Sequence, residues 1–150
     1  MAINKPVSSI MTTSTIVANA SHKISQVLRV FHEYDIHHLP VVDDSNRLIG
    51  IISSNDIPKV FNDLCNRAEK ISMDYDAIDK AVSLSSIMSP DPVTISSTAT
   101  ISEAVKVFNE KKFLALPVVD NGELVGIVSV KDVIHYISSD SHGITYNFQV

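Results

Sequence analysis

The chain has 150 residues, of which 45% are hydrophobic and 19% charged, enough for a globular protein with a buried core. Its formal net charge of −5 disfavours non-specific nucleic-acid binding, and its single cysteine excludes an internal disulfide and a thiolate metal site. No apolar run is long enough to span a membrane, and no basic region followed by an apolar one opens the chain. We therefore expect a cytoplasmic protein.

The N-terminal part of the chain predicts a short entry helix, a strand and a longer helix. Residues 7–11 have the composition of a helical turn, and the β-branched pair Ile16-Val17 indicates a short strand. Ser21 suits an N-cap, and apolar residues recur at helical spacing from Ile24 to Tyr34.

A β-hairpin is predicted next, because two apolar runs flank a polar turn. Within Leu39-Pro40-Val41-Val42-Asp43 and Leu48-Ile49-Gly50-Ile51-Ile52, the runs Val41-Val42 and Ile49 to Ile52 are apolar, mostly β-branched and of strand length. Ser53 leaves the second strand, and Asp56 lies in the first turn of the following helix, where Pro58 is tolerated. Exposed backbone N–H groups at such a helix start favour an anionic or oxygen-rich ligand.

The second half of the chain repeats this order after a charged linker. Residues 67–81 contain few helix breakers and predict a helix. Thr98 or Thr100 suits a helix cap, and Asn121-Gly122 is a strong two-residue hairpin signal. We expect helices at 84–88, 101–111 and 130–137, strands at 93–95, 115–119 and 123–129, and a polar tail at 139–150. The alternating apolar residues from Ile144 to Val150 leave open a strand added to a neighbouring chain.

The two halves are copies of one unit. Ser8-Ser9-Ile10-Met11 returns as Ser85-Ser86-Ile87-Met88, and Gly-Ile-Ile-Ser-x-x-Asp, ending at Asp56, returns as Gly-Ile-Val-Ser-x-x-Asp, ending at Asp132. The residue that the second copy lacks falls in the hairpin turn, where a deletion leaves the core pattern intact. Two copies predict a paired module rather than a solenoid.

The order strand–helix–strand–strand–helix, with Leu-Pro-Val-Val-Asp followed by Gly-hydrophobic-x-Ser-x-x-Asp in both copies, resembles the cystathionine-β-synthase (CBS) domain. The resemblance implies an α/β (α+β) fold in which two βαββα repeats pack about a pseudo-two-fold axis, a Bateman module. We place the repeats at 7–66 and 84–138, joined by the linker 67–83. In this family, clefts between the repeats often bind adenosine-containing ligands such as AMP, ADP, ATP, S-adenosylmethionine, NAD or cyclic dinucleotides.

The resemblance gives the repeated Ser-x-x-Asp motif a chemical role. A ribose offers two neighbouring hydroxyl donors, and the carboxylates of Asp56 and Asp132 can accept from both. Ser53 and Ser129 can donate to ribose or phosphate oxygens, and Lys131 can neutralise phosphate charge. Each aspartate could instead satisfy a helix dipole, and each serine could be an N-cap.

Family geometry adds the segments that precede each hairpin and divides the candidates between two clefts. One cleft would join Thr12, Val17, His37, His38, Ser129, Lys131 and Asp132; the other would join Ser53, Asp56, Ser89, Thr94 and Ala115. The first has the basic groups, so we expect it to prefer phosphate-bearing ligands.

No catalytic residue, metal site or required cofactor is predicted. Neither a nucleophile elbow, a phosphate-binding glycine loop nor a His-Glu-x-x-His motif occurs, and His37-His38 has no ligand partners at metal-site spacing. Two functions remain. The chain could be a regulatory sensor of an adenine nucleotide, or an interaction module with empty clefts. Either could act as a homodimer and through an unidentified effector protein.

Overall fold

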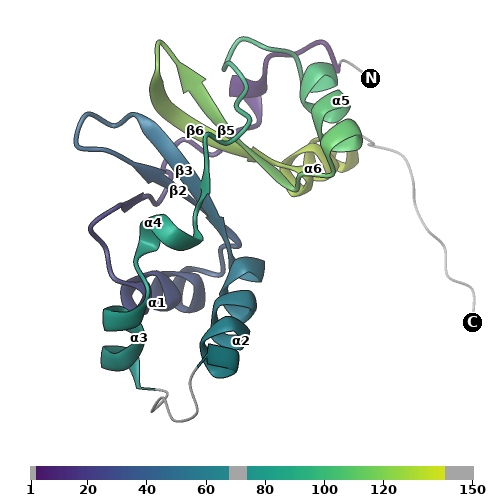
Figure 1. Ribbon diagram of the computed structural model, residues 1–150. Helices are drawn as coiled ribbons and strands as arrows, with labels where there is room; N and C mark the ends of the chain where they lie inside the picture. The colour runs from purple at the N-terminus through teal and green to yellow at the C-terminus, as the bar shows by residue number, and fades with distance from the viewer. Residues whose placement is uncertain (1–2, 68–73, 141–150) are drawn as a thin grey trace, which may run out of the picture. The chain divides into compact units, whose positions relative to one another are not determined.

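The computed structural model describes residues 3–67 and 74–140 (Figure 1). The chain forms two compact units. Unit 1 contains the described parts of Met1–Ser14, Thr94–Asp120 and Val125–Val150, and unit 2 contains those of Thr15–Val93 and Asn121–Leu124. The N-terminal segment therefore belongs with the second copy of the repeat, although it precedes the first copy in sequence.

Unit 2 contains a four-stranded sheet with the order β1-β2-β3-β4. β1 runs parallel to β2, and the other neighbours are antiparallel. Its elements in chain order are β1 (Ala18–Asn19), α1 (Ile24–Tyr34), β2 (His38–Val42), β3 (Leu48–Ser53), the 3-10 turn η2 (Ser54–Asp56), α2 (Ile57–Arg67), α3 (Tyr75–Ala81), α4 (Leu84–Ile87) and β4 (Ser89–Pro90).

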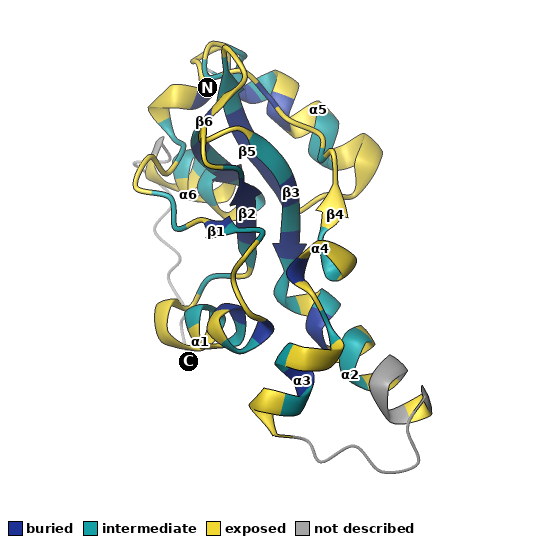
Figure 2. Ribbon diagram, turned by 60° about the vertical axis from the view of Figure 1, so that its left-hand side comes forward, coloured by how far each residue is buried: buried dark blue, intermediate teal, exposed yellow. Residues whose placement is uncertain are grey.

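The core of unit 2 lies between β2, β3 and the apolar faces of its helices. Four of the five residues of β2 are buried, which explains its nearly unbroken apolar run (Figure 2). Ile24 of α1 and Ile52 of β3 are buried in the same cluster as Ile78 of α3 and Leu84 of α4. The helices that flank the hairpin in sequence thus supply the other side of the core.

Unit 1 is built on the two-stranded sheet β5-β6. Its elements are η1 (Val7–Ser9), α5 (Ile101–Lys111), β5 (Ala115–Asp120), β6 (Glu123–Ser129) and α6 (Val130–Asp140). Val7, Ala104 and Leu116 are buried together with Val118 and Val128. Burial alternates along most of β6, as expected for a strand with one face on the core.

The entry segment of each copy crosses the second hairpin strand of the other copy at a glycine. In unit 1, Thr12 and Ile127 exchange backbone hydrogen bonds of 2.9 and 3.0 Å, and in unit 2, Ser89 pairs with Ile51. A Cβ atom on Gly126 would lie 2.8 Å from the Thr12 carbonyl oxygen, and one on Gly50 would lie 2.6 Å from Met88 Sδ. Both glycines are therefore required by close approach of the crossing segment.

The structure confirms the α+β class, both hairpins and most of the helices. Thr100 is the N-cap of α5, and its Oγ1 accepts a hydrogen bond of 3.2 Å from the Glu103 N–H. Asn121 and Gly122 both have positive φ, as a type I′ hairpin turn requires. The last helix continues to Asp140, beyond the expected end at Ile137. Residues 68–73 of the predicted linker helix and residues 141–150 of the predicted tail lie outside the described residues.

The predicted strand at Ile16-Val17 and the predicted N-cap at Ser21 are wrong. The strand pairs at Ala18–Asn19, and α1 begins after Lys23. The reason is a turn after β1, where the Asn19 side-chain oxygen accepts from both the Ser21 N–H and the Ser21 hydroxyl. Ser21 is therefore bonded within that turn and is not the cap of the helix.

The predicted strand at residues 93–95 is also wrong, because pairing there shrinks to a single parallel bridge between Ile95 and Val118. Pro90 and Pro92 lack an N–H, and Asp91 between them has a φ of 46°. Instead, the chain pairs earlier, where Ser89–Pro90 forms β4. No described helix is both long and apolar enough to cross a bilayer.

Candidate functional site

The repeated Ser-x-x-Asp motif forms a compact polar arrangement in each unit. We call residues 53–56 of unit 2 the first box and residues 129–132 of unit 1 the second box. Each box begins where the second hairpin strand ends; the first leads through η2 into α2, and the second contains the first turn of α6. The carboxylate therefore lies beside unpaired backbone N–H groups at a helix start, where negative charge is stabilised.

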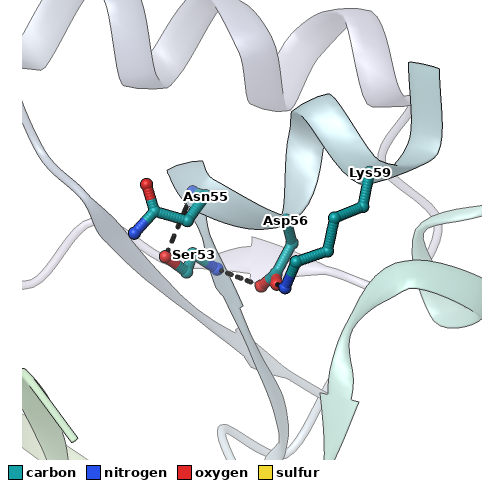
Figure 3. Close-up of polar contacts among 4 residues, drawn as sticks. All are labelled: Ser53, Asn55, Asp56 and Lys59. Carbon is teal, nitrogen blue, oxygen red and sulfur yellow. Dashed lines mark hydrogen bonds and ion pairs between the residues drawn. The ribbon is translucent and has the colours of Figure 1, made fainter. Parts of the chain in front are cut away.

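In the first box, serine and aspartate cap the turn reciprocally (Figure 3). The Ser53 N–H donates to Asp56 Oδ2 over 3.0 Å, and the Asn55 N–H donates to Ser53 Oγ over 3.2 Å. These two bonds give the Asp56 side chain a fixed direction.

A third residue, Lys59, engages the other oxygen of the first carboxylate. Its Nζ lies 3.0 Å from Asp56 Oδ1 (Figure 3), in the one ion pair formed by the side chains that the structure describes. The Lys59 side chain is 75% exposed, whereas that of Asp56 is 24% exposed. Both oxygens of Asp56 thus have a partner, one rigid and one on a long, flexible stem.

Two consecutive histidines, His37 just before β2 and His38 at its first position, lie beside the first box. His38 pairs with Ser53 across β2 and β3, and His37 Nδ1 lies 3.3 Å from Ser54 Oγ. Burial lowers the pKa of His38, repulsion from His37 lowers it further, and attraction to Asp56 offsets part of this shift. His38 therefore favours its neutral form next to the carboxylate.

In the second box, serine holds the carboxylate more tightly. The Ser129 N–H and hydroxyl both donate to Asp132 Oδ2, over 2.7 and 2.6 Å, and the Asp132 N–H donates to Ser129 Oγ over 3.2 Å. No hydrogen bond or ion pair to Oδ1 is formed by a described side chain. Lys131 is exposed beside it, and His135 occupies the position equivalent to Lys59.

Comparison with known proteins identifies the fold. The profile of the CBS domain family matches residues 7–63 and 84–139. The chain belongs to the CBS domain family. It is 30% identical over 135 residues to a CBS domain-containing protein of Dictyostelium discoideum, with 85% of this chain and 88% of that protein covered.

Other relatives are longer than this chain. It is 27% identical over 139 residues to the uncharacterized protein MJ1225 of Methanocaldococcus jannaschii, covering 93% of this chain but only 45% of that protein. It is also 28% identical over 132 residues to the inosine-5′-monophosphate dehydrogenase of Korarchaeum cryptofilum, covering 87% of this chain and 24% of that enzyme. This chain thus corresponds only to the CBS portion of that enzyme.

Solved structures support the same assignment. The crystal structure of CBSX2 in complex with AMP is 26% identical, with a TM-score of 0.75 and coverage of 91% of this chain and 98% of that one. The CBS domain pair of MJ0100, crystallised with 5′-methylthioadenosine and S-adenosyl-L-methionine, is 23% identical with the same TM-score and coverage, and shows the shared fold.

About half of the predicted site residues of this CBS pair lie in each unit. In unit 2, the first box lies with His37, His38 and Ser89, since Ser89 pairs with Ile51 two residues before Ser53. Val17, also in unit 2, is 37% exposed just before β1.

In unit 1, Thr12 pairs with Ile127, two residues before Ser129. Ala115 is buried at the start of β5, next to Leu114, whose carbonyl accepts from the Val130 N–H over 3.0 Å. Thr94 is exposed beside the Ile95 bridge. The histidines thus lie with Asp56 inside one unit, and the predicted grouping across the two copies stays a prediction.

The sequence analysis missed Lys59, although its spacing carried a signal. A basic residue three positions after an aspartate on a helix lies on the same face and can form an ion pair with it. Among the described residues, no three His, Cys, Asp or Glu side chains are grouped as a metal site would require.

Proposed function

We propose that this CBS pair is a regulatory sensor that binds adenosine-containing nucleotides, of which AMP is the first to test. The observation that carries the proposal is the twice-built box, in which a serine N–H orients an aspartate carboxylate at a helix start. The complex of the related CBSX2 with AMP supports the choice of ligand class.

The geometry suits a ribose for a simple reason. A carboxylate offers about four lone-pair directions, and the contacts to each aspartate use two of them. Both aspartates remain partly exposed, so the vicinal hydroxyls of a ribose can reach the remaining directions. Because the bonds within each box fix the carboxylate before the ligand arrives, little side-chain entropy is lost on binding.

The two boxes differ in their readiness for ligand. Asp132 Oδ1 has no partner among the described side chains, and Lys131 stands beside it as a possible phosphate contact. Asp56 is already paired with Lys59. We therefore propose that the second box binds a phosphate-bearing adenosine ligand more tightly than the first.

Isothermal titration calorimetry with AMP tests this function. We expect saturable binding that GMP does not match, and weaker binding when Asp132→Ala removes the carboxylate. Asp76→Asn, an exposed acidic change on α3, is the control for net charge. The proposal fails if AMP, ADP, ATP and S-adenosylmethionine all leave both the calorimetric trace and the melting temperature unchanged.

A second function, homodimerisation, is favoured by exposed apolar side chains in unit 1. Leu114 is 56% exposed and Ile134 of α6 is 58% exposed, while Val105 of α5 is 40% exposed. We propose that α5 and α6 contribute to a closed two-fold interface, the commonest form of homo-oligomer. Sedimentation velocity should show a dimer that Ile134→Asp converts to monomer; a monomer at all concentrations, with and without AMP, would exclude it.

A further inference from the structure

We propose that Lys59 makes the first box selective for phosphate-bearing adenosine ligands over the bare nucleoside. The inference rests on the proposed function, because it assigns a specificity-determining role at the same site. It starts from the Lys59–Asp56 ion pair, which has no counterpart among the described residues of the second box.

A nucleoside must compete with Lys59 for Asp56. With Ser53 on Oδ2 and Lys59 on Oδ1, both carboxylate oxygens are engaged before a ligand arrives. A ribose that displaces the ammonium gains hydroxyl bonds but loses an ion pair, and adenosine offers no anion in return. Lys59 therefore lowers the affinity of this box for adenosine.

A phosphate reverses the effect of Lys59. Its side chain is 75% exposed and rotates freely about a four-carbon stem, so the ammonium can leave Asp56 while remaining in water. When the ligand carries a phosphate, the same ammonium can form a charge-assisted hydrogen bond to it. Ribose then takes the place of Lys59 on Asp56, and phosphate takes the place of Asp56 on Lys59.

Among the residues around the first box, Lys59 is the one best suited to contact the phosphate. Asn55, which precedes Asp56, is uncharged, and the lowered pKa of His38 favours its neutral form. His37 contacts Ser54 through Nδ1. In the second box, Lys131 can approach phosphate without being paired to Asp132. Removal of its charge should therefore weaken the binding of nucleotides and leave the binding of adenosine unchanged.

The test measures adenosine and AMP affinity by calorimetry in an Asp132→Ala background, which leaves only the first box intact. Lys59→Met should strengthen adenosine binding up to about fivefold, the scale of one exposed ion pair. The same change should weaken AMP binding about tenfold, the scale of one charged hydrogen bond. Opposite shifts for the two ligands are the signature of the proposal.

Matched variants separate this role from general charge effects. Lys80→Met, on α3, removes the same charge from unit 2 and should leave the AMP-to-adenosine affinity ratio unchanged. Lys59→Arg should keep most of the ratio, and Asp132→Asn replaces Asp132→Ala if circular dichroism shows unfolding. If both ligands bind and Lys59→Met changes their two affinities equally or not at all, the Lys59 proposal alone is overturned. If neither ligand binds the unmodified chain, the proposed function falls with it.

Discussion

The two boxes show how one motif is held in two different ways. In the second, the Ser129 hydroxyl donates to the carboxylate over 2.6 Å, whereas in the first, Ser53 Oγ accepts from Asn55 and Lys59 holds the carboxylate instead. The copy with Lys131 anchors its aspartate from within the turn. The copy with Asn55 anchors its aspartate from the turn through the Ser53 N–H alone, and from the helix through Lys59. Equivalent positions of the repeat therefore let one copy serve as the control for the other.

The largest difference is expected at the crossing glycines. Gly126→Ala should lower the free energy of unfolding by about 3 kcal/mol, because its Cβ would meet the Thr12 carbonyl oxygen, backbone that cannot easily move. Gly50→Ala should cost about 1 kcal/mol, because the first atom it meets is the flexible Met88 thioether. Urea unfolding of both variants measures the difference, and a larger loss at Gly50 would contradict it.

Ligand binding should distinguish the two aspartates next. Asp132→Ala should weaken AMP binding by about 1.5–3 kcal/mol, the usual cost of losing a charged hydrogen-bond partner, or roughly ten- to a hundredfold. Asp56→Ala should have a smaller effect, because one oxygen of Asp56 is already engaged in the ion pair with Lys59. Calorimetry of the two single variants gives the order, and the reverse order would make the first box the principal site.

A smaller contrast is expected at the ends of α1 and α5. Both helices end in a left-handed residue, Asp35 with φ 47° in the first copy and Lys112 with φ 56° in the second. Lys112→Gly should raise stability by about 1 kcal/mol, because glycine adopts this conformation without strain. Asp35→Gly should gain roughly half as much, since aspartate tolerates the region better. Equal melting-temperature gains would show that the side-chain type does not matter here.

Much of the fold was predictable because its signals are local. Alternating or continuous apolar runs predicted both hairpins, and the sequence repeat predicted both Ser-x-x-Asp boxes. The wrong predictions lie where nearby residues impose a different local geometry. The Asn19 side chain bonds Ser21 within a turn, and the left-handed backbone of Asp91, with a φ of 46°, interrupts the extended chain before Val93.

The exchange of entry segments could not be predicted from local pattern. Gly50 and Gly126 recur at the same repeat position, but no spacing rule says that Met88 and Met11 cross them. Such contacts depend on packing between segments far apart in sequence. Lys59 was different, since its partner lay only three residues away, in the turn η2 that leads into α2.

The smallest expected difference concerns pH, because the first copy has His38 where the second has Ala115. The pKa of His38 is lowered in the folded protein, so the unfolded chain binds a proton more readily. The stability that neutral His38 contributes is complete above about pH 6.5, the unfolded pKa, and is lost as the pH falls from there towards the folded pKa.

Chemical denaturation between pH 8 and pH 5 measures this loss. His38→Ala should make the free energy of unfolding fall less steeply on acidification. His32→Ala, an exposed histidine of α1, should keep the slope of the unmodified protein. Asp56→Asn should steepen it, because Asp56 is the group that raises the pKa of His38 against burial and His37. If His38→Ala and the unmodified chain fall in parallel, His38 gains its proton as easily folded as unfolded, and the two copies do not differ in their response to acid.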